Sequence, residues 1–229
     1  MRQAWRDVVF VHWPYAPGDV SARLPEGFVA DTYDGTAWVA LSAFRVGACG
    51  LGPLPPASLW AFPETNLRTY VRDVDGIDGI WFMTIEAQTV PVTVGARLGF
   101  GAPYHHATMS VRPDRDEVRY TSRRHGTDDG GEIGHDLRIR IGDHVTEAER
   151  TGLVDWSTGR WRAWTTHLGL RLRSPVQHQP WPLHHADLLH IEQSLTAAVG
   201  LPPPAGDPLV HYSPGVDARL GAPRPGSQT

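Results

Sequence analysis

The segment Phe62–Asp73, FPETNLRTYVRD, concentrates side chains that could do chemistry. It has the character of a β-strand, in which successive side chains point to opposite faces. A carboxylate would move protons there and a guanidinium would bind an anion, so such a row could line a polar cavity. It could equally be a solvated outer face with ion pairs between strands, because a period of two does not say which face is buried. The row consists of Glu64, Asn66, Arg68, Tyr70 and Arg72.

A second candidate segment is Ala96–Ala107, ARLGFGAPYHHA. A helix that ends at Gly101 would deliver Tyr104, His105 and His106 into a constrained turn. Tyrosine and histidine together supply a hydrogen-bond donor, an acid and a base near neutral pH. The alternative is a polar loop whose histidines face water.

Other motifs predict no cofactor and no metal. His184-His185 could be imagined as metal ligands together with His190 and Glu192, but adjacent residues on a strand point apart and the helical HExxH spacing is missing. The glycines around Gly47–Gly52 have no flanking strand and helix that would make a dinucleotide cradle. Cys49 has no identifiable base partner, so we interpret it as structural.

Lysine is absent from this chain, because all 21 basic residues are arginine. The only primary amine is therefore that of the N-terminus. Since imine catalysis requires a side-chain amine of lowered pKa, no side chain here can perform it.

The composition indicates a soluble, cytoplasmic protein. A chain of 229 residues can bury a core of its own, and we expect one barrel domain over residues 1–220 with a disordered tail over 221–229. No apolar run reaches the ~18 residues that span a membrane, and a single cysteine suits a reduced compartment. A net charge of −4 gives no general attraction to nucleic acid. The expected partner is a small molecule, and the oligomeric state, a homo-oligomer included, stays open.

Strand-like segments dominate the chain, and the helices are few and short. We expect strands at 8–13, 28–32, 36–46, 59–73, 80–90, 107–112, 117–124, 136–141, 159–172 and 209–217, and helices at 16–24, 91–100, 146–153 and 191–199. This pattern predicts a mainly β (α+β) fold, built as a large antiparallel or mixed barrel with helices at its ends.

An ordered set of motifs resembles the YqjF-like family of uncharacterised bacterial proteins (domain of unknown function family 2071), relatives of acetoacetate decarboxylase. The resemblance covers nearly the whole chain in the right order. Its motifs are His12-Trp13, LPEGF at Leu24–Phe28, YDGTAWVALSAF at Tyr33–Phe44, PETNLRTYVR at Pro63–Arg72, GIWFMTIEA at Gly79–Ala87, AR…APYHHA at Ala96–Ala107, GRWRAW at Gly159–Trp164, QPWPL at Gln179–Leu183 and HYSPGVDAR at His211–Arg219.

The resemblance implies an acetoacetate-decarboxylase-like fold, a curved and largely antiparallel β-barrel that encloses a small-molecule cavity. It also implies that Glu64 matches the interior glutamate of those decarboxylases. Pro103-Tyr104-His105 resembles the turn that carries their imine-forming lysine. Because this chain has Tyr104, His105 or His106 there instead, decarboxylation through an imine is excluded.

These observations lead to an expected function in acid/base chemistry on an oxo or carboxylate compound. The reaction would be of lyase or isomerase type: a dehydration, an enolisation or a cyclisation. The expected catalytic residues are Glu64, Tyr104 and His105, and the expected substrate-binding residues are Asn66, Arg68, Arg97, His106, His12 and Trp13. Two alternatives are a non-catalytic binder of a small molecule on the same barrel and a structural protein with a filled barrel.

Overall fold

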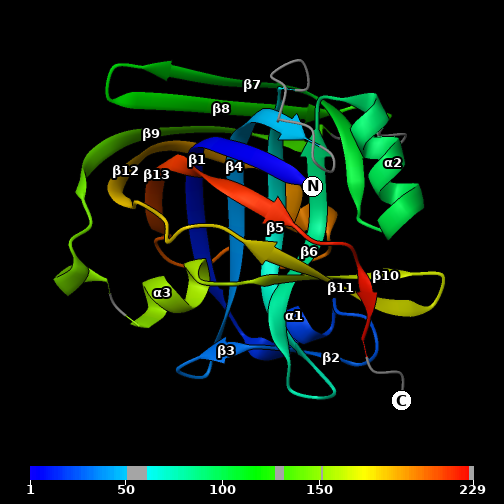
Figure 1. The fold of residues 1–229 in the computed structure, drawn as a ribbon. Helices are drawn as coiled ribbons and strands as arrows, with labels where there is room; N and C mark the ends of the chain where they lie inside the picture. Colours follow the sequence, from blue (N-terminus) through cyan, green and yellow to red (C-terminus); the bar gives the residue numbers. More distant parts are fainter. Residues whose placement is uncertain (51–60, 127–131, 151, 227–229) are drawn as a thin grey trace.

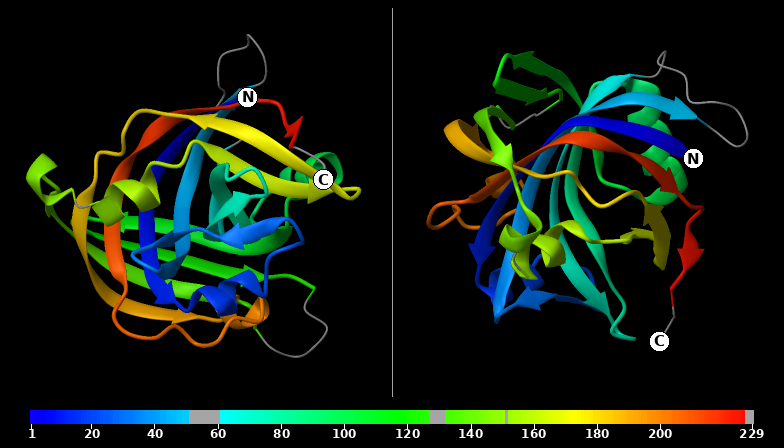
Figure 2. Two further views of the ribbon diagram at one scale, coloured as in Figure 1. Left: turned by 90° about the horizontal axis from the view of Figure 1, so that it is seen from below. Right: turned by 60° about the vertical axis from the view of Figure 1, so that its left-hand side comes forward.

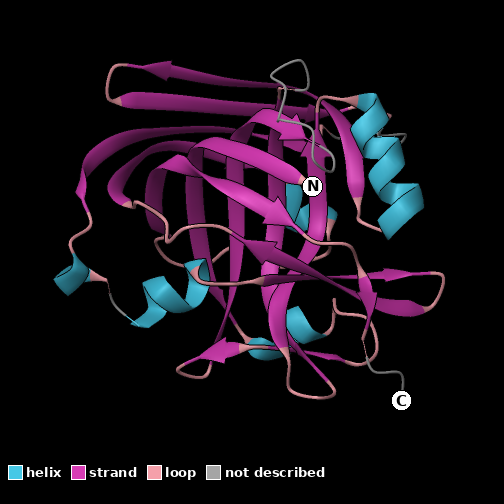
Figure 3. Ribbon diagram, viewed as in Figure 1, coloured by secondary structure: helices cyan, strands magenta, loops and turns pink. Residues whose placement is uncertain are grey.

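The computed structural model describes residues 1–50, 61–126, 132–150 and 152–226. Most of them belong to one strongly curved sheet, with short helices at its margins (Figures 1 and 3). The strands are β1 Arg2–Tyr15, β2 Phe28–Ala30, β3 Thr32–Tyr33, β4 Thr36–Gly50, β5 Phe62–Asp73, β6 Asp78–Ala87, β7 Tyr104–Asp114, β8 Glu117–Arg124, β9 Gly134–His144, β10 Arg162–His167, β11 Leu170–Gln177, β12 His184–Gln193, β13 Leu209–Leu220 and β14 Arg224–Pro225. The helical elements are α1 Pro17–Ser21, α2 Val90–Phe100, the 3₁₀ turn η2 Glu147–Glu149, α3 Gly152–Thr158 and α4 Leu195–Ala198.

The strand pairings form two rings that share a wall. In the first ring the hydrogen-bonded order β5-β6-β7-β8-β9-β12-β13-β1-β4 returns to β5. In the second, β6 pairs with β10, β10 with β11 and β11 with β13, so the path returns through β1, β4 and β5. The pairings are antiparallel except for β6–β7 and β6–β10. Figure 2 shows the curvature from below.

The shared wall, β13-β1-β4-β5-β6, is covered on both faces. Toward the first ring, Val11, Leu41 and Leu67 lie in an apolar core with side chains of β8 and β9. Toward the second ring, Phe10 and Phe44 pack against the segment that carries Trp181. Because both faces are buried, these strands lack the one-sided alternation of a surface strand.

The expected fold class is confirmed, and two expected elements are wrong. Residues 159–172 are two strands rather than one: Leu168 and Gly169 both have positive φ and turn β10 into β11. The helix expected at 191–199 begins late, because Ile191–Gln193 complete β12 and pair with β9. Long-range pairing decides this segment over local propensity.

Smaller differences concern the third helix and the tail. The capping box of Thr146 and Glu149 forms as expected, but it starts a 3₁₀ turn, and α3 follows as a separate helix. Part of the expected disordered tail pairs with the sheet, because Arg224–Pro225 form β14 next to β11. No helix among the described residues is both long and apolar enough to cross a membrane.

Candidate functional site

The polar row of β5 is buried, which excludes the solvated outer face. Glu64, Asn66 and Arg68 are 8%, 4% and 9% exposed, and Tyr70 is fully covered. Only Arg72, at the end of the row, reaches solvent, where it pairs with Asp31. The row belongs to the face of the shared wall that looks into the second ring, since Glu64 lies beside Phe44 in the β4–β5 register.

Glu64 and Tyr104 meet at the upper end of this row. The Tyr104 hydroxyl donates a hydrogen bond to Glu64 Oε2 over 3.0 Å. Burial raises the pKa of Glu64 to about 7, although hydrogen bonds from Tyr104 and Asn66 oppose the shift. Burial and the charge of Glu64 raise the pKa of Tyr104 well above its ordinary value. Near neutral pH the pair is therefore a carboxyl group poised to gain or lose a proton beside a phenol that keeps its own.

Arg68 is a buried cation without a counter-ion. No carboxylate of the described chain lies within ion-pair distance of it, and its Nε has no hydrogen-bond partner. Its guanidinium lies over the ring of Phe10, 5.2 Å from the centroid, and it lowers the pKa of Tyr70 against the effect of burial. Because a buried charge is costly unless it is paired, this arrangement suits an anionic ligand.

Three more unpartnered polar atoms lie on the same face as Arg68 Nε. They are His12 Nδ1, Ser42 Oγ and Asn66 Oδ1. Ser42 is opposite Asn66 in the β4–β5 register, and His12 and Arg68 are both opposite Ala40. Since buried polar groups are normally satisfied, a patch of orphaned donors and acceptors indicates a place for a ligand or ordered water.

His12 is linked to the row through Tyr70. Its Nε2 lies 2.8 Å from the Tyr70 hydroxyl. Burial lowers the pKa of His12 well below its ordinary value, and the charge of Arg68 acts in the same direction. The imidazole is therefore neutral at physiological pH and can offer either a donor or an acceptor at Nδ1.

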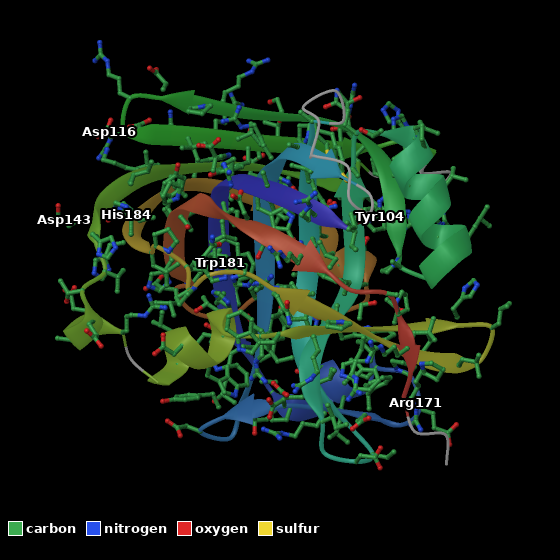
Figure 4. All side chains as sticks on the ribbon, viewed as in Figure 1. Tyr104, Asp116, Asp143, Arg171, Trp181 and His184 are labelled. Atoms are coloured by element: carbon green, nitrogen blue, oxygen red, sulfur yellow. The ribbon has the colours of Figure 1, made fainter. Side chains whose placement is uncertain are left out.

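Aromatic side chains close the other side of the patch. Trp181 meets the ring of Phe10 edge-on at 5.0 Å and lies in front of the shared wall (Figure 4). His178 is next to it at 4.8 Å, and burial together with the charge of Arg68 lowers the pKa of His178. The site thus lies between the wall and the segment that leads into β12.

The structure separates Tyr104 from His105. The two are consecutive on β7, and His105 is opposite Glu86, on the face turned away from Glu64. Burial and the charges of Arg124 and Arg97 lower the pKa of His105 to about 4. The expectation that both side chains share one cavity with Glu64 is corrected by this alternation.

Three expected binding residues also lie away from the row. Trp13 follows His12 on β1, so its side chain lies on the opposite face of the strand, buried in the apolar core of the first ring. Arg97 is exposed on α2. His106 contacts the carbonyl oxygen of Gln88 and stacks on His125. The structure thus gathers Glu64, Asn66, Arg68, Tyr104 and His12 and leaves the others outside.

Sequence reasoning missed several members of this site. Ser42 is a lone hydroxyl within the apolar run of β4, and that break in polarity was the available signal. Tyr70 belongs to the expected polar row but is not among the expected catalytic or binding residues. Trp181 and His178 come from a distant segment, and no local pattern shows which strand they cover.

Two grooves lie elsewhere on the surface. One, of about 560 Å³, is lined by Met1, Pro175 and Arg219 among others, and one of about 440 Å³ by Trp161 and Arg173 among others. Neither groove includes a residue of the β5 row. Ligand binding at the β5 row is therefore part of the proposal below. No group of three or more potential metal ligands occurs within the described part of the chain.

The fold belongs to the class of acetoacetate-decarboxylase-like proteins. The structure superimposes on acetoacetate decarboxylase from Legionella pneumophila with a TM-score of 0.70 and 12% identity, covering 99% of this chain and 87% of that one. An acetoacetate decarboxylase-like enzyme from Sphingomonas wittichii RW1 matches with a TM-score of 0.65 and 14% identity, over 99% and 92% of the two chains. The enduracididine biosynthesis enzyme MppR, complexed with pyruvate, matches with a TM-score of 0.65 and 12% identity, over 98% and 89%.

Within this class the chain belongs to the DUF2071 family of uncharacterised conserved proteins, which it matches over residues 2–217. It is 36% identical over 216 residues to the uncharacterised protein YqjF of Bacillus subtilis (strain 168), covering 93% of this chain and 87% of that protein. The expected family and fold are therefore confirmed. Identities of 12–14% to the solved structures extend the likeness to the fold alone.

Proposed function

We propose that this protein is a small-molecule enzyme of lyase or isomerase type that acts on an oxo carboxylate by acid/base chemistry. The observation that carries the proposal is Arg68, a buried guanidinium with an unpartnered Nε and no carboxylate of the described chain as its counter-ion. A substrate carboxylate would supply the missing charge through the planar fork of the guanidinium.

Proton transfer in this proposal falls to Glu64. Its pKa of about 7 lets it act as a base in one step and as an acid in the next. It lies four residues from Arg68 on the same face of β5, with Asn66 between them. A substrate held at Arg68 would therefore present the carbon next to its carbonyl group in the direction of Glu64.

Tyr104 would stabilise negative charge. Its raised pKa keeps the phenol protonated, so it can donate a hydrogen bond to an enolate oxygen as that charge develops. It belongs to the turn that resembles the lysine-bearing turn of the decarboxylases. A phenol at this position supports enolisation or dehydration and offers no route to an imine.

The test is deuterium exchange at carbon. A panel of 2-oxo and 3-oxo acids in D₂O would be followed by proton NMR, and we expect one of them to exchange the hydrogens next to its carbonyl group or to be converted. Glu64→Gln should slow this reaction by about a hundredfold or more. Arg68→Gln should weaken binding of the same acid.

Exposed residues provide matched controls. Glu192→Gln and Arg138→Gln make the same chemical changes at positions open to solvent, and we expect no effect from either. Exchange that proceeds equally in wild type and Glu64→Gln would refute the assignment of the base.

The second candidate is a non-catalytic binding protein. It is favoured by the Tyr104–Glu64 hydrogen bond, in which a phenol from the turn that resembles the lysine-bearing turn occupies the carboxylate. A binder would return its oxo acid unchanged and without deuterium after prolonged incubation. Saturable binding that Arg68→Gln abolishes, together with absent exchange, would decide for the binder.

A further inference from the structure

A second buried guanidinium, that of Arg160, lies beside the ring of Tyr70. The residue follows α3 in the sequence and is 5% exposed. The guanidinium carbon lies 5.1 Å from the centroid of the Tyr70 ring and 4.2 Å from that of Trp156. Arg68 and Arg160 both lower the pKa of Tyr70 against the effect of burial. Two buried guanidiniums therefore act on one phenol.

Most donors of Arg160 are used to hold it in place. Nε donates to the carbonyl oxygen of Trp156 over 2.8 Å, and Nη1 donates to Asp31 over 2.8 Å and to Asp78 over 3.1 Å. Nη2 is buried and has no partner. The guanidinium is thus fixed by one half of its fork while the other half remains free to bind.

The charges around Arg160 leave a positive excess. Arg72 and Arg162 pair with the same two carboxylates, so three guanidiniums share Asp31 and Asp78. Arg72 and Arg162 are partly open to solvent, whereas Arg160 is not. An additional oxygen anion at Nη2 would meet both an unused donor and an uncompensated charge.

From this arrangement we infer that Arg160 is a second ligand-anchoring residue and that the ligand is a short dicarboxylate. One carboxylate would bind Arg68 and the other would bind Nη2 of Arg160, with Tyr70 and His12 between them. The chain between the two carboxylates must be short, because both guanidiniums act on the same tyrosine side chain. The inference rests on the proposed anion site at Arg68.

Matched acids test the inference. Two pairs of acids would be used, succinate with butyrate and glutarate with valerate, and the members of each pair differ chiefly in the second carboxylate. Their dissociation constants would be measured by NMR titration. We expect wild type to bind each dicarboxylate about tenfold more tightly than its partner. Arg160→Lys keeps the charge but loses the free half of the fork, and it should remove most of this preference while leaving the monocarboxylates unaffected.

Control variants separate this inference from the proposed function. Arg138→Lys, on exposed β9, should change neither class of acid. If Arg160→Lys does not fold, Arg160→Gln combined with Asp31→Asn serves instead, because it removes the guanidinium together with its buried carboxylate partner and leaves Asp78 paired with Arg162. Monocarboxylate binding that Arg68→Gln abolishes supports the proposed function whatever Arg160 does.

The possible outcomes are distinct. A dicarboxylate preference that survives loss of the Arg160 fork, or no preference in wild type, overturns the inference while binding at Arg68 stands; Nη2 would then be satisfied by water only. Failure of every acid to bind, or binding that ignores Arg68→Gln, overturns the proposed function and this inference with it.

Discussion

Glu64 shows how burial gives one carboxyl group a use near neutral pH. The side chain is almost fully covered, and the loss of hydration outweighs the hydrogen bonds from Tyr104 and Asn66 that favour its charged form. The result is a pKa of about 7 rather than 4.5. Function and stability are thus linked at this residue.

The link predicts a pH-dependent stability. The folded protein holds the Glu64 proton up to about pH 7, whereas the unfolded chain releases it near pH 4.5. Wild type should therefore lose stability relative to Glu64→Gln as pH rises through this window, by up to about 3 kcal/mol. Urea unfolding of both proteins at pH 4, 6 and 8 measures the difference. A constant difference would show that Glu64 has an ordinary pKa.

Ser42 supplies the second prediction at this scale. Its buried hydroxyl has no partner, so Ser42→Ala should leave stability unchanged or raise it by about 1 kcal/mol while weakening ligand binding. Ser213→Ala is the matched control, because that equally buried hydroxyl accepts a hydrogen bond from the Gly215 amide. The control should lose about 1 kcal/mol. A clear loss of stability in Ser42→Ala would mean that its hydroxyl is satisfied.

At the scale of elements, β5 and β6 carry different chemistry on their two faces. The face toward the second ring holds the site. On the other face, Glu86 is completely buried and pairs with Arg124, which also donates to Thr84. Burial raises the pKa of Glu86, and the charge and hydrogen bonds of Arg124 oppose the shift.

This ion pair should respond as a unit. Arg124→Met leaves an unpaired buried carboxylate and should cost about 3–5 kcal/mol at pH 8, less at pH 5 where Glu86 can take up a proton. The double variant with Glu86→Gln should recover most of that loss. Urea unfolding at both pH values checks the prediction, and a loss that does not depend on pH would contradict it.

At the scale of the whole molecule, the shared wall separates the apolar core of the first ring from the candidate site in the second. The first ring is filled largely by apolar side chains such as Tyr120, Leu137 and Ile139. The second places its polar row opposite aromatic side chains. Substitution of the candidate binding residues can therefore leave the apolar core of the first ring intact.

The absence of lysine predicts a negative result for the molecule as a whole. Incubation with any oxo acid followed by borohydride should leave no mass adduct on an internal peptide, because the only primary amine is at Met1. Peptide mass spectrometry measures this directly. An adduct at any other residue would overturn the exclusion of imine chemistry.

Much of this protein could be predicted from residue types and their spacing. Strand β5 ends at Asp73 as expected and begins at Phe62, while the expected start at 59–60 lies outside the described residues. The alternation of its side chains places Glu64, Asn66 and Arg68 together, and the lack of lysine limits the chemistry. These features are local, because a strand repeats every two residues and composition needs no geometry. Local patterns failed at Ile191–Gln193, where pairing with β9 decided the structure.

Only the tertiary structure decided which face of β5 is functional. It buried the row beside Phe10 and Phe44, brought Glu64 to Tyr104, turned His105 and Trp13 away, and left Arg68 without a counter-ion among the described residues. Each of these facts depends on strands that are distant in sequence. Burial and charge pairing depend on which residues are neighbours in space. Those neighbours are set by the pairing of strands that are distant in sequence, which local sequence patterns do not contain.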